Sequence, residues 1–212
     1  MLELAIPEGA KNILCLGAHA DDIEIGCGGT LLKWIAARPD LRVRWVVFTA
    51  EGKRAGEARQ SAKVLLGKSA GKVVLKNFRT SFLPFQGTKV KEFFETLRDG
   101  HEPDVIFTHY RDDRHQDHRL LSDLTWNTFR NHLVLEYEIP KYDGDLSSPN
   151  FFVPLDKHLS HTKAAHICRY FQTQGNKHWF AEETFLALMR LRGVECATQY
   201  AEAFYCRKLV CA

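Results

Sequence analysis

The sequence predicts an α/β fold, a doubly wound, mainly parallel sheet with helices on both faces. Three observations support this. The length of 212 residues suits one such domain and is short for two. Apolar runs of strand length alternate with amphipathic stretches of helix length, which is typical of parallel sheets. Two of these runs end abruptly in polar clusters, as strands do at the edge of a sheet where ligands bind. We therefore expect one Rossmann-like domain over residues 1–212.

The elements of the first half follow from apolar periodicity and turn residues. An apolar run from Ile13 ends at His19, and helical spacing continues over 30–37 and stops near Pro39. Residues 49–54 are expected to form a loop at the ligand-binding edge of the sheet. The same patterns predict strands at 41–48, 73–78 and 105–108 and helices at 55–66 and 90–98.

The second half contains the most loop-like part of the chain. Residues 140–150 are rich in turn-forming residues and are long enough to be a lid or substrate loop. Before them, a predicted strand at 133–139 carries Glu136 and Glu138 in alternation with apolar residues, as on a strand with one wetter face. The remaining predicted elements are a helix after His118, helices at 156–172 and 182–192, and a last strand at 203–209.

A histidine and two carboxylates follow the first predicted strand directly, in the run His19-Ala20-Asp21-Asp22. His19 and Asp22 are three residues apart, so one turn can aim both side chains at one point. Imidazole and carboxylate are a common pair of zinc ligands. Asp21 would then lie beside the metal, where a carboxylate that is not a ligand can act as general base toward a bound water.

A second polar cluster ends the strand predicted at 105–108, in the run His115-Gln116-Asp117-His118-Arg119. If both strands are parallel, both clusters emerge at the same edge of the sheet. There His118 can complete a facial set of two histidines and one aspartate with His19 and Asp22. Zinc is therefore the leading cofactor.

The two clusters also carry a resemblance. With Gly28-Gly29 after the first of them, they resemble the two signature motifs of the PIG-L/LmbE family of zinc-dependent de-N-acetylases. That family usually reads His-Pro-Asp-Asp and His-Pro-Asp-His. Ala20 and Gln116 stand at the two proline positions, which alters loop stiffness but removes no functional side chain. Ile23 stands where an acid often follows the two aspartates.

The resemblance implies a metal-dependent hydrolase. His19, Asp22 and His118 match the metal ligands of the family, and Asp21 matches its general base. The metal is expected to be Zn²⁺, with another divalent ion such as Fe²⁺ as the alternative. Such a metal lowers the pKa of its bound water from about 15.7 to roughly 7, so that Asp21 can take the proton.

The resemblance also implies roles for residues around the metal. His115 matches the histidine that assists the tetrahedral intermediate, so the oxyanion would be stabilised by zinc and a protonated His115. Asp117 matches a partner that orients an imidazole. Arg54 matches an arginine that holds substrate hydroxyls, with Arg59 as the alternative. Whether Asp21 or His115 protonates the departing amine stays open.

The expected substrate comes from the resemblance as well. Family members remove N-acetyl groups from amino sugars, so an N-acetylglucosamine-like conjugate is the expected small-molecule partner, and its aglycone stays open. The C-terminal part, about residues 140–212, is expected to close over the site and to vary with substrate. The family tends to assemble, which leaves a homo-oligomer open.

Composition bears on other partners and on location. The formal charge is +3, and no long run of lysine and arginine is present to follow a phosphate backbone, so nucleic acid is not expected as the main ligand. No stretch approaches about 18 uninterrupted apolar residues, and Met1–Leu4 lacks the features of a signal peptide. We expect a cytoplasmic protein without a membrane anchor. The six cysteines form no Cys-x-x-Cys pair and are expected to be free thiols, although Cys27 lies near the proposed site.

Two readings from other classes remain open. A nucleotide-binding α/β module would use Gly26 to Gly29 as a phosphate loop, and its ligand binding would survive chelation of metal. Close packing of a helix on a strand also explains these glycines. A non-catalytic carbohydrate-binding module would keep the fold, and even the metal, without turnover.

Overall fold

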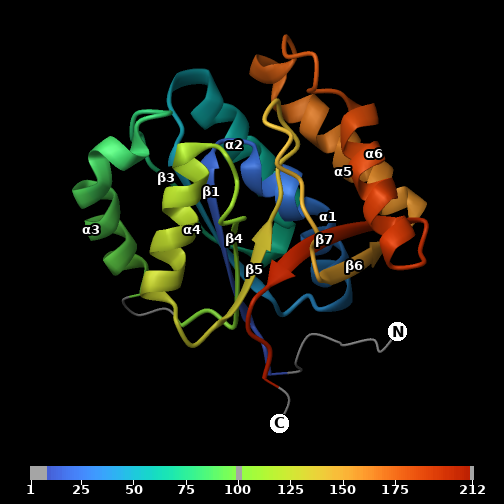
Figure 1. The fold of residues 1–212 in the computed structure, drawn as a ribbon, viewed down its shortest axis with the longest axis horizontal. Helices are drawn as coiled ribbons and strands as arrows, with labels where there is room; N and C mark the ends of the chain where they lie inside the picture. The colour runs from blue at the N-terminus through green and yellow to red at the C-terminus, as the bar shows by residue number, and fades with distance from the viewer. Residues whose placement is uncertain (1–8, 99–101, 211–212) are drawn as a thin grey trace.

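The computed structural model describes residues 9–98 and 102–210, and within them seven strands form one sheet in the order β3-β2-β1-β4-β5-β7-β6 (Figure 1). The strands are β1 (Asn12–His19), β2 (Arg42–Thr49), β3 (Ala70–Leu75), β4 (Val105–His109), β5 (Leu133–Tyr137), β6 (Phe151–Leu155) and β7 (Tyr200–Cys206). β1 to β5 are parallel, and β7 pairs antiparallel with both β5 and β6.

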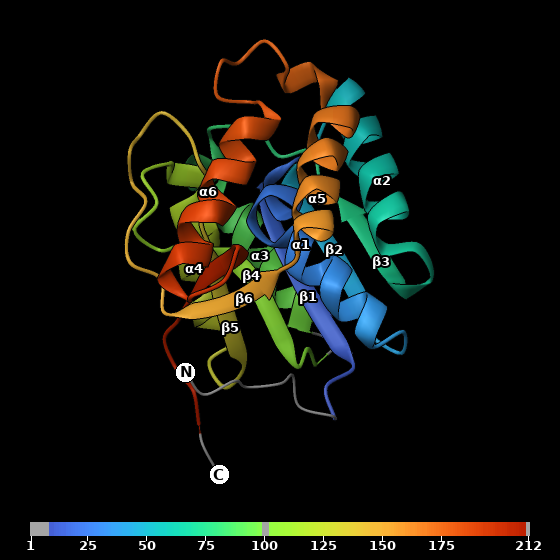
Figure 2. The same ribbon diagram turned by 90° about the vertical axis from the view of Figure 1, so that its right-hand side faces the viewer.

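Six α-helices cover the two faces of this sheet (Figures 1 and 2). They are α1 (Asp22–Ala37), α2 (Gly52–Leu66), α3 (Gly87–Arg98), α4 (Gln116–Thr128), α5 (Lys157–Tyr170) and α6 (Glu182–Glu195), with short 3₁₀ turns at Gly67–Ser69, Leu83–Gln86 and Gln172–Gln174. α1, α2, α5 and α6 enclose one apolar core, and α3 and α4 enclose the other. The predicted fold class, a doubly wound α/β sheet that is mainly parallel, is confirmed.

The pattern of β1 explains why the sheet needs helices on both sides. Ile13 and Cys15 point into the core under α1, whereas Leu14 and Leu16 point into the core under α3 and α4. Successive side chains of a strand face opposite sides, so a continuous apolar run is buried only when both faces are covered.

Several predicted boundaries are wrong. The third strand is Ala70–Leu75 and not 73–78, and the last strand is Tyr200–Cys206 and not 203–209. α2 begins at Gly52, so Arg54 lies in the first turn of a helix and not in a loop. Gly52 has a φ of 54°, a conformation that glycine adopts without steric cost, and it allows the helix to begin earlier than the apolar pattern indicates.

The expectation of a wet face on β5 is also wrong. Glu136 is fully buried and accepts hydrogen bonds from the backbone N–H of Arg111 and the indole N–H of Trp126. Glu138, just after the strand, is 6% exposed and forms a two-point ion pair with Arg192 of α6. The alternation of glutamate with apolar residues predicts a solvent-facing side of the strand. Carboxylates can nevertheless be buried when they are hydrogen-bonded or paired with a cation.

The glycines of α1 permit close packing. A Cβ atom on Gly26 would lie 2.2 Å from the ring of Tyr137, and one on Gly29 would lie 2.6 Å from Leu155. The backbone N–H groups of Gly29 and Thr30 both donate to the carboxylate of Glu202. These amides are already bonded to a side chain, which argues against the phosphate-loop reading.

Residues 138–150 contain no helix or strand and connect β5 to β6, as the turn-rich composition predicts (Figure 1).

Among the helices in the described part of the chain, none is both long and apolar enough to cross a membrane.

Candidate active site

The site lies where β1 and β4 end side by side at the centre of the sheet. The chain order reverses between these two strands, since β2 and β3 lie beyond β1 while β5 lies beyond β4. Such a switch point is the usual binding crevice of an open α/β sheet. β1 ends at His19 and β4 at His109, and the helices that follow, α1 and α4, begin at the same edge.

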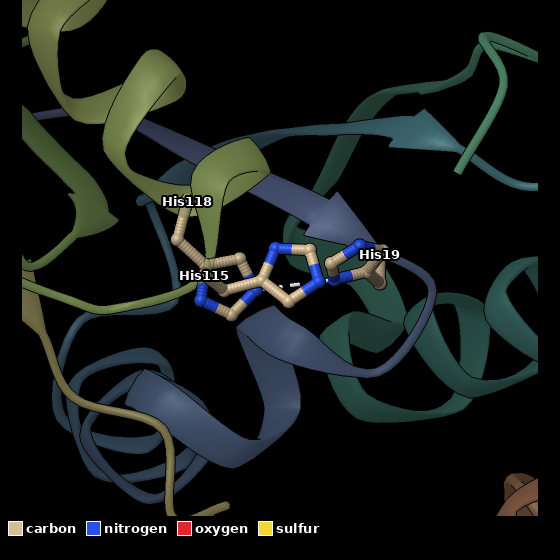
Figure 3. Close-up of side chains that lie close together, drawn as sticks. All are labelled: His19, His115 and His118. Atoms are coloured by element: carbon tan, nitrogen blue, oxygen red, sulfur yellow. Dashed lines mark hydrogen bonds between the residues drawn. The ribbon is translucent and has the colours of Figure 1, made fainter. Parts of the chain in front are cut away.

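The three predicted metal ligands lie together at this edge. The distances are 3.1 Å between His118 Nε2 and His19 Nδ1, 3.3 Å between His19 Nδ1 and Asp22 Oδ2, and 3.6 Å between His118 Nε2 and Asp22 Oδ2. Donors bonded to one tetrahedral zinc at about 2.0–2.1 Å lie roughly 3.3–3.4 Å apart. The donor set and its spacing therefore fit a zinc-sized ion. Figure 3 shows the rings of His19, His115 and His118 close together, with a dashed line for the contact between His19 and His118.

The histidines and aspartates of this cluster shift one another's pKa values. Burial lowers the pKa of His118, with His109 adding to the effect, to about 3. Burial also acts to lower the pKa of His19, but Asp22 and Asp117 outweigh it and raise that pKa to about 9. Burial acts to raise the pKa of Asp22, but the surrounding histidines hold it well below its usual range. A divalent cation would take the place of the proton on His19.

Two carboxylates support the histidines from behind. Asp113 Oδ2 lies 2.8 Å from Nδ1 of His118, and Asp117 Oδ2 lies 3.3 Å from Nε2 of His19. Asp117 is itself fixed by the backbone N–H groups of Ser81 and Leu83, at 2.7 and 3.0 Å. The predicted supporting residue Asp117 thus contacts His19. Asp113 contacts the imidazole of His118. Asp113 lies in the loop between β4 and α4, where no helix or strand periodicity predicts that contact.

His109 is a further buried member of the cluster that sequence reasoning missed. Its Nε2 lies 3.2 Å from Asp22 Oδ2 and accepts the backbone N–H of Ala18 at 3.0 Å. Its ring stacks on His118 with centroids 3.8 Å apart. A signal was present, because His109 ends the apolar run of β4 as His19 ends that of β1.

The predicted general base and the predicted substrate arginine form an ion pair. Asp21 Oδ1 accepts from Arg54 Nη2 at 3.0 Å, and Asp21 is 4% exposed. Burial and the adjacent Asp22 raise the pKa of Asp21, and Arg54 partly offsets this. Arg54 Nε is buried and has no hydrogen-bond partner among the described residues, whereas the alternative residue Arg59 is exposed.

His115 caps the N-terminus of α4 beside the cluster. Its Nδ1 accepts the backbone N–H of Asp117 at 3.2 Å, and its ring lies 4.7 Å from that of His19 and 4.6 Å from that of His118 (Figure 3). Burial lowers its pKa, and the neighbouring His19 lowers it further. The lowered pKa favours the neutral form of the ring, and because Nδ1 already accepts a hydrogen bond, an incoming proton would bind Nε2.

Cys27 packs in the core of α1. Its thiol bonds the carbonyl of Ile23 at 3.3 Å, and its side chain is fully buried in the apolar cluster. Of the other cysteines, Cys15, Cys168, Cys196 and Cys206 are free thiols, and Cys211 lies outside the described residues.

Known proteins resemble this chain in both sequence and fold. A family model described as PIG-L, GlcNAc-PI de-N-acetylase, matches residues 14–129, more than half of the chain. The uncharacterised deacetylase YaiS of Escherichia coli K12 is 29% identical over 143 residues, which span 61% of this chain and 75% of that protein.

Two solved structures show how widely the fold is shared. N,N'-diacetylchitobiose deacetylase from Pyrococcus horikoshii has a TM-score of 0.74 at 22% identity, over 93% of this chain and 84% of that one. GalB, the 4-carboxy-2-hydroxymuconate hydratase of Pseudomonas putida KT2440, has a TM-score of 0.70 at 16% identity, over 95% and 98%. A deacetylase and a hydratase share this fold, so the reaction has to be argued from the site.

Proposed function

Because the chain belongs to the PIG-L family, a family of deacetylases, we propose that it uses a divalent metal to remove the N-acetyl group of an N-acetylglucosamine-like sugar conjugate. The single observation that carries the proposal is the donor triangle of His19, Asp22 and His118 with a further carboxylate, Asp21, beside it. A binding module that only holds a metal has no need for that second buried carboxylate.

The metal would be held by His19 Nδ1, Asp22 Oδ2 and His118 Nε2. We propose Zn²⁺, with Fe²⁺ as the alternative, because two imidazoles and one carboxylate suit either ion. When bound, such an ion polarises the acetyl carbonyl and lowers the pKa of a coordinated water. The neutral state of His118 suits a ligand, and Asp113 and Asp117 hold the two rings in place from their far sides.

Asp21 acts as general base in this proposal. Burial raises its pKa toward the working pH. A general base is most effective there, because it is still ionised yet binds a proton strongly enough to remove it from water. Arg54 limits that rise through its ion pair and keeps the carboxylate ionised. The side chain of Arg54 is 27% exposed beside Asp21, so its guanidinium group would donate to a substrate hydroxyl, which supports its predicted role in substrate binding.

His115 lies beside the proposed ligands His19 and His118. It would take up a proton at Nε2 as the tetrahedral intermediate forms, hold the oxyanion together with the metal and help the amine to leave. Its Nδ1 is occupied by the backbone of Asp117, which fixes the ring orientation for this task. Amino sugars are favoured as substrate because the family model and the chitobiose deacetylase both name N-acetylated amino sugars.

Amine release from a panel of soluble N-acetylglucosamine conjugates tests the proposal. The protein is stripped with a chelator and reloaded with Zn²⁺ or Fe²⁺, and each form is assayed beside Asp21→Asn. We expect turnover to need metal, and Asp21→Asn to keep its metal but lose about 100-fold or more in kcat. Metal content is measured by mass spectrometry.

The other outcomes discriminate between the readings. Metal binding and sugar binding without amine release from any conjugate favour the non-catalytic carbohydrate module. A wild-type protein that binds no divalent metal contradicts the central assignment. Full activity in Asp21→Asn leaves the hydrolase but removes Asp21 from the role of base.

A further inference from the structure

A lysine from the 140–150 segment reaches the support of a proposed metal ligand. Lys141 Nζ lies 2.9 Å from Asp113 Oδ2, the same oxygen that contacts Nδ1 of His118 at 2.8 Å. The ammonium also contacts Asp145 Oδ2 at 2.5 Å, within its own segment. The metal ligand, the carboxylate, the lysine and the second carboxylate therefore form one continuous chain of contacts.

The chain of contacts is buried and held at both ends. The side chains of Lys141, Asp113 and Asp145 are 9%, 2% and 7% exposed. Asp113 uses its other oxygen to accept the backbone N–H of His115 at 2.7 Å. Asp145 Oδ2 accepts the backbone N–H of Arg114, also at 2.7 Å. The segment 140–150 is thus fastened to the loop between β4 and α4, from which the ligand His118 follows.

Lys141 is needed because two carboxylates meet here. Asp113 and Asp145 come from different segments, and both contact the one ammonium group. Without that cation, two shielded carboxylates would repel each other, and a buried charge that has lost its partner is strongly unfavourable. Asp113 would then move toward solvent or change partner, and His118 would lose the acceptor that fixes its ring.

We propose that Lys141 is a positioning residue for the metal centre, which holds Asp113 on His118 and couples the 140–150 segment to metal binding. The inference rests on the proposed function only in taking His118 as a metal ligand. By linkage, metal binding should steady the segment as much as the segment steadies the metal. The segment that the sequence marks as a lid or substrate loop thereby contributes to the metal site itself.

The test measures Zn²⁺ affinity by competition with a chromophoric chelator, on folded protein and without any substrate. Lys141→Met alone also removes a positive charge near a dication, which by itself favours metal binding. The decisive variant is therefore the charge-balanced pair Lys141→Met with Asp145→Asn. We expect its affinity to fall about 10- to 100-fold, because the buried carboxylate of Asp113 loses its ammonium partner even though the repulsion from Asp145 is removed. Lys141→Arg, which can still bridge two carboxylates, should stay within about threefold of wild type.

A matched control separates positioning from general loss of stability. Lys163 and Glu202 form another buried pair, with side chains 5% and 3% exposed, that touches none of the proposed ligand side chains. Lys163→Met with Glu202→Gln makes the same charge-balanced change there. We expect it to lower the melting temperature but to leave Zn²⁺ affinity within about threefold of wild type.

Hydrogen exchange gives a readout that a merely structural role would not change. In wild type, Zn²⁺ should slow amide exchange in residues 140–150, and in Lys141→Met with Asp145→Asn it should not. Wild-type affinity in that variant, or an equal loss in the control pair, overturns the proposal while leaving the deacetylase assignment intact. A wild type that binds no Zn²⁺ overturns both.

Discussion

At the scale of single residues, the site depends on how burial and charge are balanced at Asp21. Burial and Asp22 raise its pKa, whereas Arg54, 3.0 Å away on a neighbouring helix, and His19 lower it. Arg54 is 27% exposed at its side chain, so it lies at the border between the buried cluster and solvent. It can therefore contact both Asp21, the proposed base, and a substrate at the surface of the cluster.

Removal of Arg54 should shift the pH dependence of the reaction. In Arg54→Ala the pKa of Asp21 rises further, and since the base must be ionised, the acidic limb of kcat/KM moves to higher pH. KM should rise roughly tenfold because a charged hydrogen-bond donor to substrate is lost. The measurement is a pH–rate profile with saturating metal.

Arg54→Lys is the matched control. It keeps the positive charge but loses the planar donor group, so its acidic limb should stay near that of wild type while KM still rises. An acidic limb that is identical in Arg54→Ala and wild type would show that Arg54 does not influence the base.

At the scale of elements, α1 is the helix that both carries the site and packs most closely on the sheet. Asp21 and Asp22 stand at its N-terminus, and Gly26, one turn later, lies against the ring of Tyr137. Tyr137 belongs to β5, and its phenol donates to the carbonyl of Leu16 in β1. This hydrogen bond fixes the position of the ring. The position of Asp21 and Asp22 thus depends on a close contact that a glycine permits.

Gly26→Ala should destabilise the protein by at least about 2 kcal/mol, because the new methyl group would overlap a fixed aromatic ring. Chemical denaturation followed by circular dichroism measures the change. Gly56→Ala, in α2, is the control, since a Cβ there meets nothing within 4 Å.

The control should change stability in the opposite direction. Alanine favours a helix interior over glycine by about 0.5–1 kcal/mol, so Gly56→Ala is expected to be slightly more stable than wild type. Equal stability of Gly26→Ala and Gly56→Ala would contradict the close contact with Tyr137.

At the scale of the whole molecule, buried ion pairs join the C-terminal strands and helices to the N-terminal part. Lys163 of α5 bonds Glu202 of β7 at 2.6 Å and also donates to the carbonyl of Ile25 in α1. Glu202 in turn accepts two backbone N–H groups of α1. One ion pair therefore holds three elements that are far apart in the sequence.

Glu202→Gln should lower the free energy of unfolding by roughly 3 kcal/mol, because it leaves the ammonium of Lys163 buried without a counter-charge. Urea denaturation gives the value. Glu95→Gln, which breaks an exposed pair with Lys91 on α3, should produce no measurable change. Similar effects of the two substitutions would show that the buried pair is not important for stability.

Much of the fold could be predicted at this scale, since strand and helix periodicity is a local property of the chain. The misplaced features are those in which a partner distant in sequence overrides the pattern. Glu136 and Glu138 are polar by composition but buried by pairing with Trp126 and Arg192. Local patterning does not predict β6, because Phe151–Leu155 is stabilised by its antiparallel pairing with β7, which follows two helices later.

The sequence by itself determined the two motifs, the strands that carry them and the residue types that a metal-dependent hydrolase needs. These follow from spacing over a few residues, which local geometry fixes. Only the tertiary structure decided that β1 and β4 are neighbours, that His109 and Asp113 join the cluster, and that Lys141 reaches Asp113. The reason is physical: such contacts join residues tens of positions apart, and they form only once the sheet order and the packing of the loops are set.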